Sequence, residues 1–262
     1  MHPAVTATGA TPPGNARLRT ARVAARVLRA LMGPAPGLAV VLGTGLGTFM
    51  EGLSVDCECP FSDIPGWRNT SIFGHKGTIV LCRRGDKPLV VLSGRVHLYE
   101  GHSPRDVALP LWSLREWGVK HVVVTCAAGG VSDVCRVGAT VEIGTILDFQ
   151  RFAFGRLSPG RLRVSDAGAV YAAMPGPHYE TAADVAVLRC LGVDMVGMSC
   201  AAEVAAAQQV GLGCRAIAVV TNTLAQAETP ADNHVPKDDL HAEVVRIASQ
   251  AAGALADVIF SP

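Results

Sequence analysis

Short apolar runs recur along the chain, and glycine or polar residues follow each of them. The most apolar runs are residues 38–42, 88–92 and 121–125, which are rich in valine and leucine. Continuous runs of this length are typical of strands that are buried on both faces of a sheet. Further runs predict strands at residues 78–82, 141–149, 171–174, 193–196 and 214–220. The two runs at 78–82 and 88–92 are joined by a short polar turn and predict a hairpin.

Helical periodicity separates many of these strands. Residues 16–32 place leucines and valines on one side and arginines on the other, which predicts an amphipathic helix. Similar patterns predict helices at residues 104–117, 182–191, 201–210 and 238–258. Strands that alternate with helices indicate an α/β protein. We expect a single-domain, three-layer α/β/α fold over residues 16–262, with a central mixed, largely parallel sheet.

Three segments lack either periodicity. Residues 1–15 consist mainly of Ala, Thr, Pro and Gly, which predicts a disordered N-terminal tail and not a signal peptide. Residues 52–77 and 150–168 contain proline and glycine breakers, so we expect irregular structure there.

Composition excludes several classes of function. The net charge of +1 and the absence of a basic run argue against nucleic-acid binding. No apolar run approaches the roughly 18 residues that a membrane span needs. The eight cysteines include no CxxC pair, so we expect no metal site. Four of them lie in or beside apolar runs, which favours buried reduced thiols and a cytoplasmic location: Cys82, Cys126, Cys190 and Cys214.

Residues 93–102 hold the densest chemistry in the sequence, directly after the strand at 88–92. Arg95 and His97 are two positions apart, so on an extended backbone they point the same way. A guanidinium and an imidazole on one side suit an oxyanion such as phosphate. Tyr99 continues that side with a ring and a hydroxyl. Ligands of α/β sheets bind at strand ends of this kind, although a solvated polar loop is the alternative.

Other strand ends carry weaker signals. The glycine-rich turn around Thr44 could present N–H groups to an anion or be a plain tight turn. Ser199 precedes a helix and could cap it or bind an anion there. Glu180 also lies near a helix start, where capping is its ordinary role. Asn222, at the end of a strand, is either a turn former or an amide that reads a base.

Two histidines lie outside these clusters. His75 is expected at the tip of a turn and His241 in the first turn of the last helix. For each of them taken alone, exposure to solvent is the ordinary expectation.

The order and spacing of the motifs resemble the trimeric type of purine nucleoside phosphorylase, in the family that also includes methylthioadenosine phosphorylase. The resemblance spans roughly residues 20–258 and implies the nucleoside phosphorylase fold. The segments that carry it are Val-Leu-Gly-Thr-Gly-Leu-Gly (41–47), Gly-Arg-Val-His-Leu-Tyr-Glu-Gly (94–101), Ala-Ala-Gly-Gly (127–130), Gly-Pro-His-Tyr-Glu-Thr (176–181), Gly-Met-Ser (197–199) and Thr-Asn (221–222).

This resemblance implies reversible phosphorolysis of a purine nucleoside to free purine and ribose 1-phosphate. The residues implied to bind phosphate are Thr44, Arg95, His97, Ala127 through its backbone, and Ser199. Those implied at the ribose are Tyr99, Met198, Tyr179 and His241, and those at the purine are Glu180, Asn222 and Tyr179. Asn222, His97 and Glu180 are the implied catalytic residues, and His75 matches a histidine on a mobile loop beside the site.

The chemistry of these residues fits a 6-oxopurine. An ionised Glu180 only accepts hydrogen bonds, which suits N1–H and a 2-amino group. Asn222 can bond N7 and O6, whereas the aminopurine branch typically has aspartate there. The implied substrates are therefore inosine, guanosine and their deoxy forms, with inorganic phosphate as co-substrate and neither a metal nor an organic cofactor. The implied assembly is a homotrimer.

Three departures from the family pattern keep other functions open. Cys126 stands where asparagine is usual, Thr223 stands where lysine is more usual, and the segment 150–168 is shorter than the family's loop. These differences leave room for a phosphorylase of methylthioadenosine or another modified nucleoside. A nucleoside hydrolase and a non-catalytic purine-binding relative are the remaining alternatives.

Overall fold

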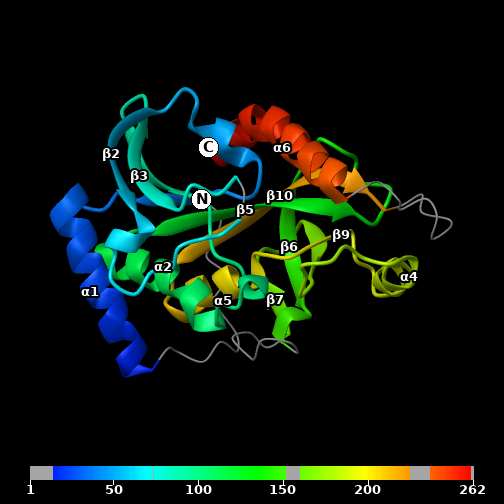
Figure 1. The fold of residues 1–262 in the computed structure, drawn as a ribbon, viewed down its shortest axis with the longest axis horizontal. Helices are drawn as coiled ribbons and strands as arrows, with labels where there is room; N and C mark the ends of the chain where they lie inside the picture. The colour runs from blue at the N-terminus through cyan, green and yellow to red at the C-terminus, as the bar shows by residue number, and fades with distance from the viewer. Residues whose placement is uncertain (1–13, 73, 152–159, 225–236, 261–262) are drawn as a thin grey trace.

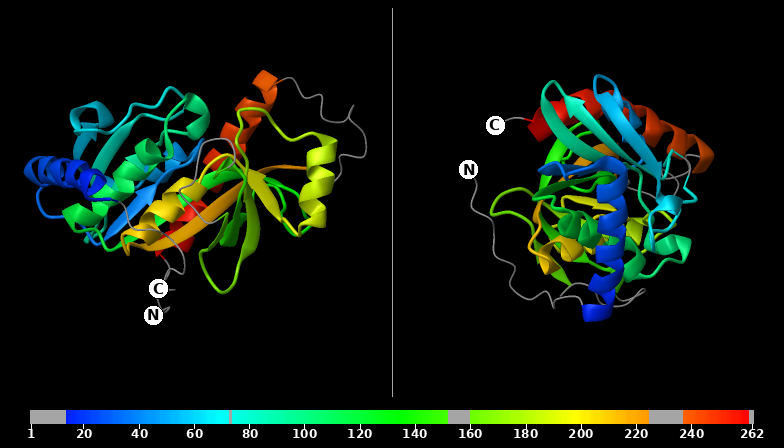
Figure 2. Two further views of the ribbon diagram at one scale, coloured as in Figure 1. Left: turned by 90° about the horizontal axis from the view of Figure 1, so that it is seen from below. Right: turned by 90° about the vertical axis from the view of Figure 1, so that its left-hand side faces the viewer.

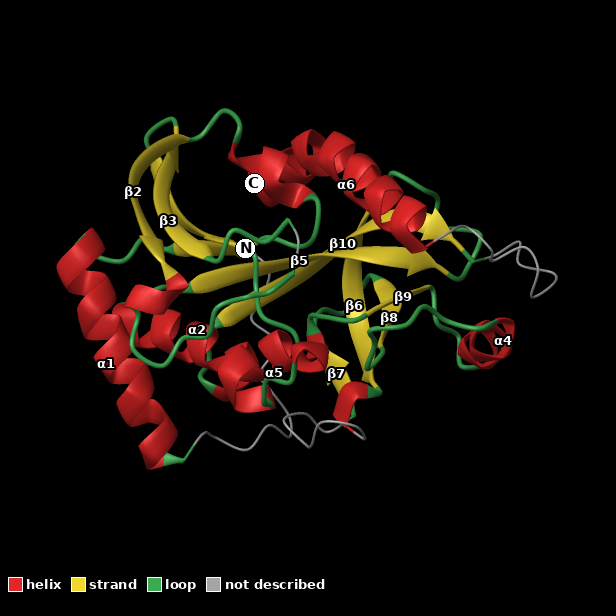
Figure 3. Ribbon diagram, viewed as in Figure 1, coloured by secondary structure: helices red, strands yellow, loops and turns green. Residues whose placement is uncertain are grey.

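The computed structural model describes residues 14–72, 74–151, 160–224 and 237–260, and its strands form one ten-stranded sheet (Figures 1 and 3). The predicted tail at residues 1–15 falls almost wholly outside these ranges. The strands are β1 (Leu38–Val41), β2 (Ser54–Pro60), β3 (Thr78–Arg84), β4 (Lys87–Ser93), β5 (His121–Gly130), β6 (Thr140–Asp148), β7 (Arg161–Arg163), β8 (Ala169–Ala173), β9 (Met195–Gly197) and β10 (Gly213–Thr223).

Helices flank this sheet. The α-helices are α1 (Asn15–Met32), α2 (Pro104–Trp117), α4 (Ala182–Cys190), α5 (Ala201–Gln209) and α6 (Lys237–Phe260). Three short 3-10 helices are η1 (Leu46–Met50), η2 (Phe61–Asp63) and η3 (Leu98–Glu100). In the two views, α6 lies on one side of the central strands, and α1, α2 and α5 lie on the other (Figures 1 and 2). None of the described helices combines the length and apolar composition that a membrane crossing requires.

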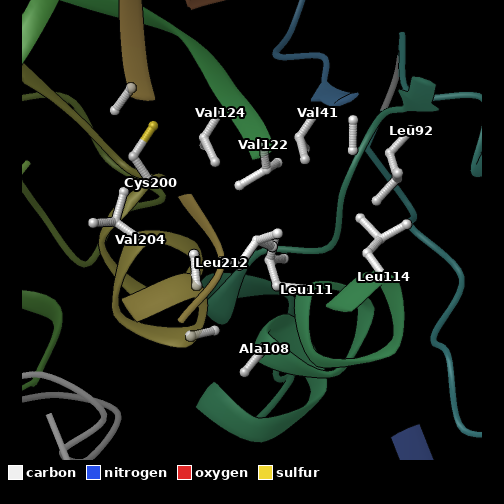
Figure 4. Packing of buried hydrophobic residues seen from close by; sticks show 14 of the residues in the cluster. Val41, Leu92, Ala108, Leu111, Leu114, Val122, Val124, Cys200, Val204 and Leu212 are labelled. Atoms are coloured by element: carbon white, nitrogen blue, oxygen red, sulfur yellow. The ribbon is translucent and has the colours of Figure 1, made fainter. Parts of the chain in front are cut away.

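The central strands are apolar on both faces because each face has its own core. Along β1, Val40 packs in the core beneath α6, and the next residue, Val41, packs in the core that α1, α2 and α5 share. Along β5, Val123 and Val124 divide in the same way. Figure 4 shows the core on the side of α1, α2 and α5, where Val41 and Val124 face Leu111 and its neighbours on α2. The continuous apolar runs in the sequence therefore predicted strands at the correct places.

The sheet is less parallel than the sequence indicated. Its order is β10-β6-β8-β9-β5-β1-β4-β3-β2, with β7 beside β6, and β10 also pairs with β5. Strands β5, β10, β6, β8 and β9 therefore form a closed ring. Among the described strand pairings, five are parallel and five are antiparallel. The expectation of a mixed sheet is confirmed, but the sheet is not largely parallel, because the ring contains two antiparallel pairs, β10–β6 and β5–β9, and the β2-β3-β4 meander is antiparallel.

Two strands lie in segments that we expected to be irregular. β2 is an edge strand with a single buried residue, Cys59, so it has no apolar run. β7 is only three residues long. The cysteine expectation also needs a correction: all eight thiols are free, and Cys82 and Cys126 are buried, but Cys190 is exposed at the end of α4 and Cys214 is only partly buried.

Candidate active site

One cavity of about 270 Å³ lies where strands β1, β4, β5, β9 and β10 end. It brings together residues that are up to 201 positions apart in the sequence, from Gly43 to Val244. Eleven of the twelve residues predicted for the site line it: Thr44, Arg95, His97, Tyr99, Ala127, Tyr179, Glu180, Met198, Ser199, Asn222 and His241. His75, the twelfth, lies behind Thr44, to which it is hydrogen-bonded.

Arg95 is the buried cation of this cavity, with 5% of its surface exposed. Its Nη2 donates to the carbonyl oxygens of Val41 (3.1 Å), at the end of β1, and of Thr125 (2.5 Å), within β5. The Glu203 carboxylate lies 3.1 Å from Arg95 Nε, close enough for an ion pair, although the N–H is not aligned for a hydrogen bond. These contacts fix the guanidinium plane at the floor of the cavity.

His97 is held by a carboxylate. Glu100 Oε1 lies 3.2 Å from His97 Nδ1 and accepts the His97 backbone N–H at 2.6 Å. The pKa of Glu100 is lowered to about 2: burial alone would raise it, but hydrogen bonds from His97 and Ser71 outweigh burial. An ionised Glu100 keeps the proton of His97 on Nδ1, so Nε2 is left for a ligand. Burial lowers the pKa of His97, so the ring is favoured in its neutral form.

His75 is buried rather than solvated, with 8% of its surface exposed. Its Nε2 lies 3.1 Å from Thr44 Oγ1, and its Nδ1 contacts the backbone of Arg95. Burial, followed by the neighbouring His97, lowers its pKa to about 4. Gly94 makes this packing possible, since a Cβ there would stand 2.6 Å from the His75 Cβ and its φ is +108°. His75 was therefore predicted correctly to lie at a turn, but the prediction that it would be exposed to solvent was wrong.

The cavity lining also includes a carboxylate and an amide, those of Glu180 and Asn222. Thr181 caps α4 with Asp184, so Glu180 takes no part in capping and the ordinary reading of this residue was wrong. Burial raises the pKa of Glu180. Asn222 follows an irregularity in the β10–β5 pairing, and its Oδ1 accepts a hydrogen bond from Thr221 Oγ1 at 3.2 Å. Both side chains have donor or acceptor atoms that suit a heteroaromatic base.

Ser199 also lines the cavity. The cap residue of α5 is Cys200, with φ +70°, so Ser199 is not the N-cap. The Ser199 N–H contacts the hydroxyl of the buried Tyr171 at 3.4 Å. The buried thiol of Cys200 lies 3.9 Å from Arg95 Nη1. Cys126, the departure noted in the sequence, lines the cavity itself.

Sequence reasoning missed the residues that hold the lining in place. Glu100, Glu203 and Gln150 were given no role, yet Gln150 Nε2 donates to the Met198 carbonyl at 2.8 Å and to the Met174 carbonyl. Glu100 stands inside the quoted motif, so its spacing from His97 was the available signal. Gln150 and Glu203 have no comparable signal, because only the tertiary fold brings them to the site.

Comparison with known proteins agrees with this geometry. The model of the Phosphorylase superfamily matches residues 38–168 and 162–261. Purine nucleoside phosphorylase of Mycobacterium leprae is 35% identical over 239 residues, which cover 85% of this chain and 88% of that protein. That of Geobacillus stearothermophilus is 31% identical over 229 residues, covering 77% and 84%.

Solved structures give the same result for the fold. Schistosoma mansoni purine nucleoside phosphorylase in complex with adenosine superposes with a TM-score of 0.81 at 25% identity, covering 92% of this chain and 95% of that one. The Schistosoma enzyme in complex with hypoxanthine gives a TM-score of 0.76 at 26% identity, covering 92% and 94%.

Proposed function

This chain belongs to the purine nucleoside phosphorylase family, and from that premise we propose that it phosphorolyses 6-oxopurine nucleosides such as inosine and guanosine. The observation that carries the proposal is a single cavity whose lining includes a cation and an imidazole as well as a carboxylate and an amide. The first two groups suit an anion and the last two suit a purine, so both could be bound in one cavity with the sugar between them.

The proposed reaction breaks the C1′–N9 bond and forms a bond from a phosphate oxygen to C1′. Arg95, His97 and Ser199 would hold phosphate next to C1′, where positive charge develops. The bond's electron pair leaves with the purine, and a hydrogen bond from Asn222 to N7 would stabilise that charge. Tyr99 and Met198, which also line the cavity, would contact the ribose. Inorganic phosphate is the co-substrate, and the proposal involves no metal or organic cofactor.

Glu180 supports the choice of a 6-oxo base. An ionised carboxylate accepts the N1–H of hypoxanthine or guanine, and it has no donor for the unprotonated N1 of adenine. Asn222 adds an amide that can donate to N7 and O6. The Schistosoma enzyme has been solved with both hypoxanthine and adenosine, so the fold admits either type of base, and the choice of a 6-oxo base rests on Glu180 and Asn222.

The proposal is tested by incubating the purified protein with inosine, guanosine, adenosine and methylthioadenosine, with and without phosphate. We expect free hypoxanthine or guanine only when phosphate is present. Base release in phosphate-free buffer would indicate a hydrolase, and preference for adenosine or methylthioadenosine would overturn the specificity. A Glu180→Gln variant should raise KM for inosine more than KM for phosphate. Glu116→Gln removes a carboxylate outside the cavity lining and serves as the control.

We also propose that the enzyme is a cytoplasmic homotrimer. The trimer rests on the family resemblance, and the location on eight free thiols, which favour a reducing compartment. Light scattering on the eluting protein tests the assembly, and microscopy of the tagged protein in its own cells tests the location.

A further inference from the structure

We infer that Glu203 is a positioning residue that fixes Arg95 and the Ser199–Cys200 turn in one arrangement, and so sets the affinity for phosphate. This inference rests on the proposed function only in naming phosphate as the anion. Glu203 lies on α5 and does not line the cavity described above, so it would act on phosphate through other residues.

The carboxylate of Glu203 contacts two separate segments beside the proposed phosphate site, one at Arg95 and one at Cys200. Its Oε1 lies 3.1 Å from Arg95 Nε, on the segment that follows β4. Its Oε2 accepts the backbone N–H of Cys200 at 2.9 Å, on the turn that opens α5. Ser199, directly before that turn, lines the cavity together with Arg95. One side chain therefore ties together two segments that lie about a hundred residues apart in the sequence.

The guanidinium of Arg95 is almost fully engaged by the protein. Nη2 donates to two backbone carbonyls, those of Val41 and Thr125. Nη1 carries two N–H groups, and its weak contact with Cys200 Sγ at 3.9 Å uses one of them. Little more than one N–H of Arg95 is thus left to donate to a ligand in the cavity. Whether that N–H points at an anion depends on the tilt of the guanidinium plane, which Glu203 helps to set.

Burial makes this pair sensitive to a change of charge. The side chains of Arg95 and Glu203 are 4% and 3% exposed. Burial alone would lower the pKa of Arg95, but the carboxylate of Glu203, with Cys200 and Cys126 behind it, raises it instead. If Glu203 lost its charge, the guanidinium would remain buried and uncompensated, and would rotate toward other acceptors.

The experiment compares Glu203→Gln with the parent enzyme. Glutamine has nearly the same shape, keeps one oxygen acceptor and lacks the charge. We expect KM for phosphate to rise roughly 10- to 100-fold, the range that misplacement of a binding group produces. KM for inosine should change less than about threefold, and saturating phosphate should restore most of kcat. Glu142→Gln removes the carboxylate from a half-exposed pair with Arg215 and should leave both KM values unchanged.

A merely structural role for Glu203 would raise both KM values together or neither, and either result overturns the inference. If the glutamine variant does not fold, Glu203→Asp is measured in its place. It keeps the charge on a shorter arm and should raise KM for phosphate selectively as well.

A binding measurement separates this inference from the proposed reaction. Phosphate raises the melting temperature of a protein that binds it in the folded state. The Gln or Asp variant should need roughly tenfold more phosphate than the parent for the same rise. This readout needs no turnover: if the parent fails to cleave inosine, the proposed function fails, while the phosphate shift still decides the role of Glu203. An equal shift in the variant and the parent would contradict it.

Discussion

At the scale of single residues, burial sets the protonation states that this site can use. Burial lowers the pKa of both histidines beside the anion subsite, so neutral rings face the cavity or support it. Burial also raises the pKa of Glu180. Glu100, in contrast, is held ionised because it accepts several hydrogen bonds. Burial therefore favours the neutral forms of these three groups, whereas hydrogen bonds keep Glu100 charged.

His75 should make the folded protein less stable in mild acid. Its pKa is about 4 in the folded protein and about 6.5 when unfolded, so between these values the unfolded chain binds more protons. The free energy of unfolding should therefore fall as pH drops from 6.5 to 4, by an amount on the order of 3 kcal/mol in full. Urea unfolding at pH 7.5, 6 and 5 measures this, and His75→Gln should flatten the curve. His121→Gln, on an exposed residue of β5, should keep the parent's slope. If His75→Gln also kept that slope, the assignment would be wrong.

Glu180 should make base selection depend on pH. Because burial raises its pKa, this carboxylate takes up a proton at a higher pH than an ordinary glutamate. A protonated carboxyl can donate to the N1 of adenine, whereas the ionised form suits the N1–H of hypoxanthine. Calorimetry with the two free bases should show the preference for hypoxanthine shrinking as pH falls from 7.5 toward 4.5, the ordinary pKa of a glutamate. Glu180→Gln should show a preference that does not change with pH, and a flat profile in the parent would exclude this role.

Residue reasoning alone located part of the candidate site. The spacing of Arg95 and His97 pointed to an oxyanion because two positions on an extended backbone share a side. Glu180 and Asn222 each had an ordinary alternative, and only the family resemblance predicted that they face the same cavity. Glu203 could not be found this way, because a glutamate in the first turn of a helix normally caps it, as this one also does.

At the scale of elements, strand ends and helix caps hold the lining in place. Strands buried on both faces were predicted well, because their apolar runs are unbroken. β2 and β7 were missed, since an edge strand with one buried side chain and a three-residue strand leave no run to detect. Closure of the ring was missed for another reason: the β10–β5 and β10–β6 pairs join distant segments, and no local period encodes them.

The cap of α4 should matter for the base more than for the anion. Thr181, the residue after Glu180, accepts the Asp184 N–H through its Oγ1 at 3.2 Å. The Asp184 carboxylate in turn accepts hydrogen bonds from the Thr181 N–H and hydroxyl. Thr181→Ala should lower the free energy of unfolding by about 1 kcal/mol and free the start of the helix. KM for inosine should then rise while KM for phosphate stays near the parent value. Ser103→Ala removes the equivalent cap of α2 and should cost similar stability without raising KM for inosine. Equal kinetics in both variants would contradict a role for the α4 cap.

At the scale of the whole molecule, the cavity depends on packing across both faces of the sheet. Arg95 is contacted by Glu203 of α5, a helix on one face of the sheet. His241 and Val244 line the cavity from α6, on the other face of the sheet. α6 is held against η1 by a hydrogen bond from Thr48 Oγ1 to the Ser249 carbonyl at 2.9 Å. The lining of the site therefore depends on helices packed against both faces of the sheet.

Gly45 offers a test of this dependence. It has φ +77°, and a Cβ there would stand 2.7 Å from the Ala248 Cβ and 2.9 Å from the Val245 backbone, so Gly45→Ala should push α6 away from the turn after β1. Gly52 is the matched control, because its φ is +84° and a Cβ there meets nothing within 4 Å. Gly52→Ala should cost about 1 kcal/mol of stability, the backbone penalty alone, and leave activity unchanged. Gly45→Ala should cost clearly more in urea unfolding and also raise KM for inosine, since His241 and Val244 move with the helix. If both variants lost the same stability and kept the parent's KM, the position of α6 would have no influence on the site.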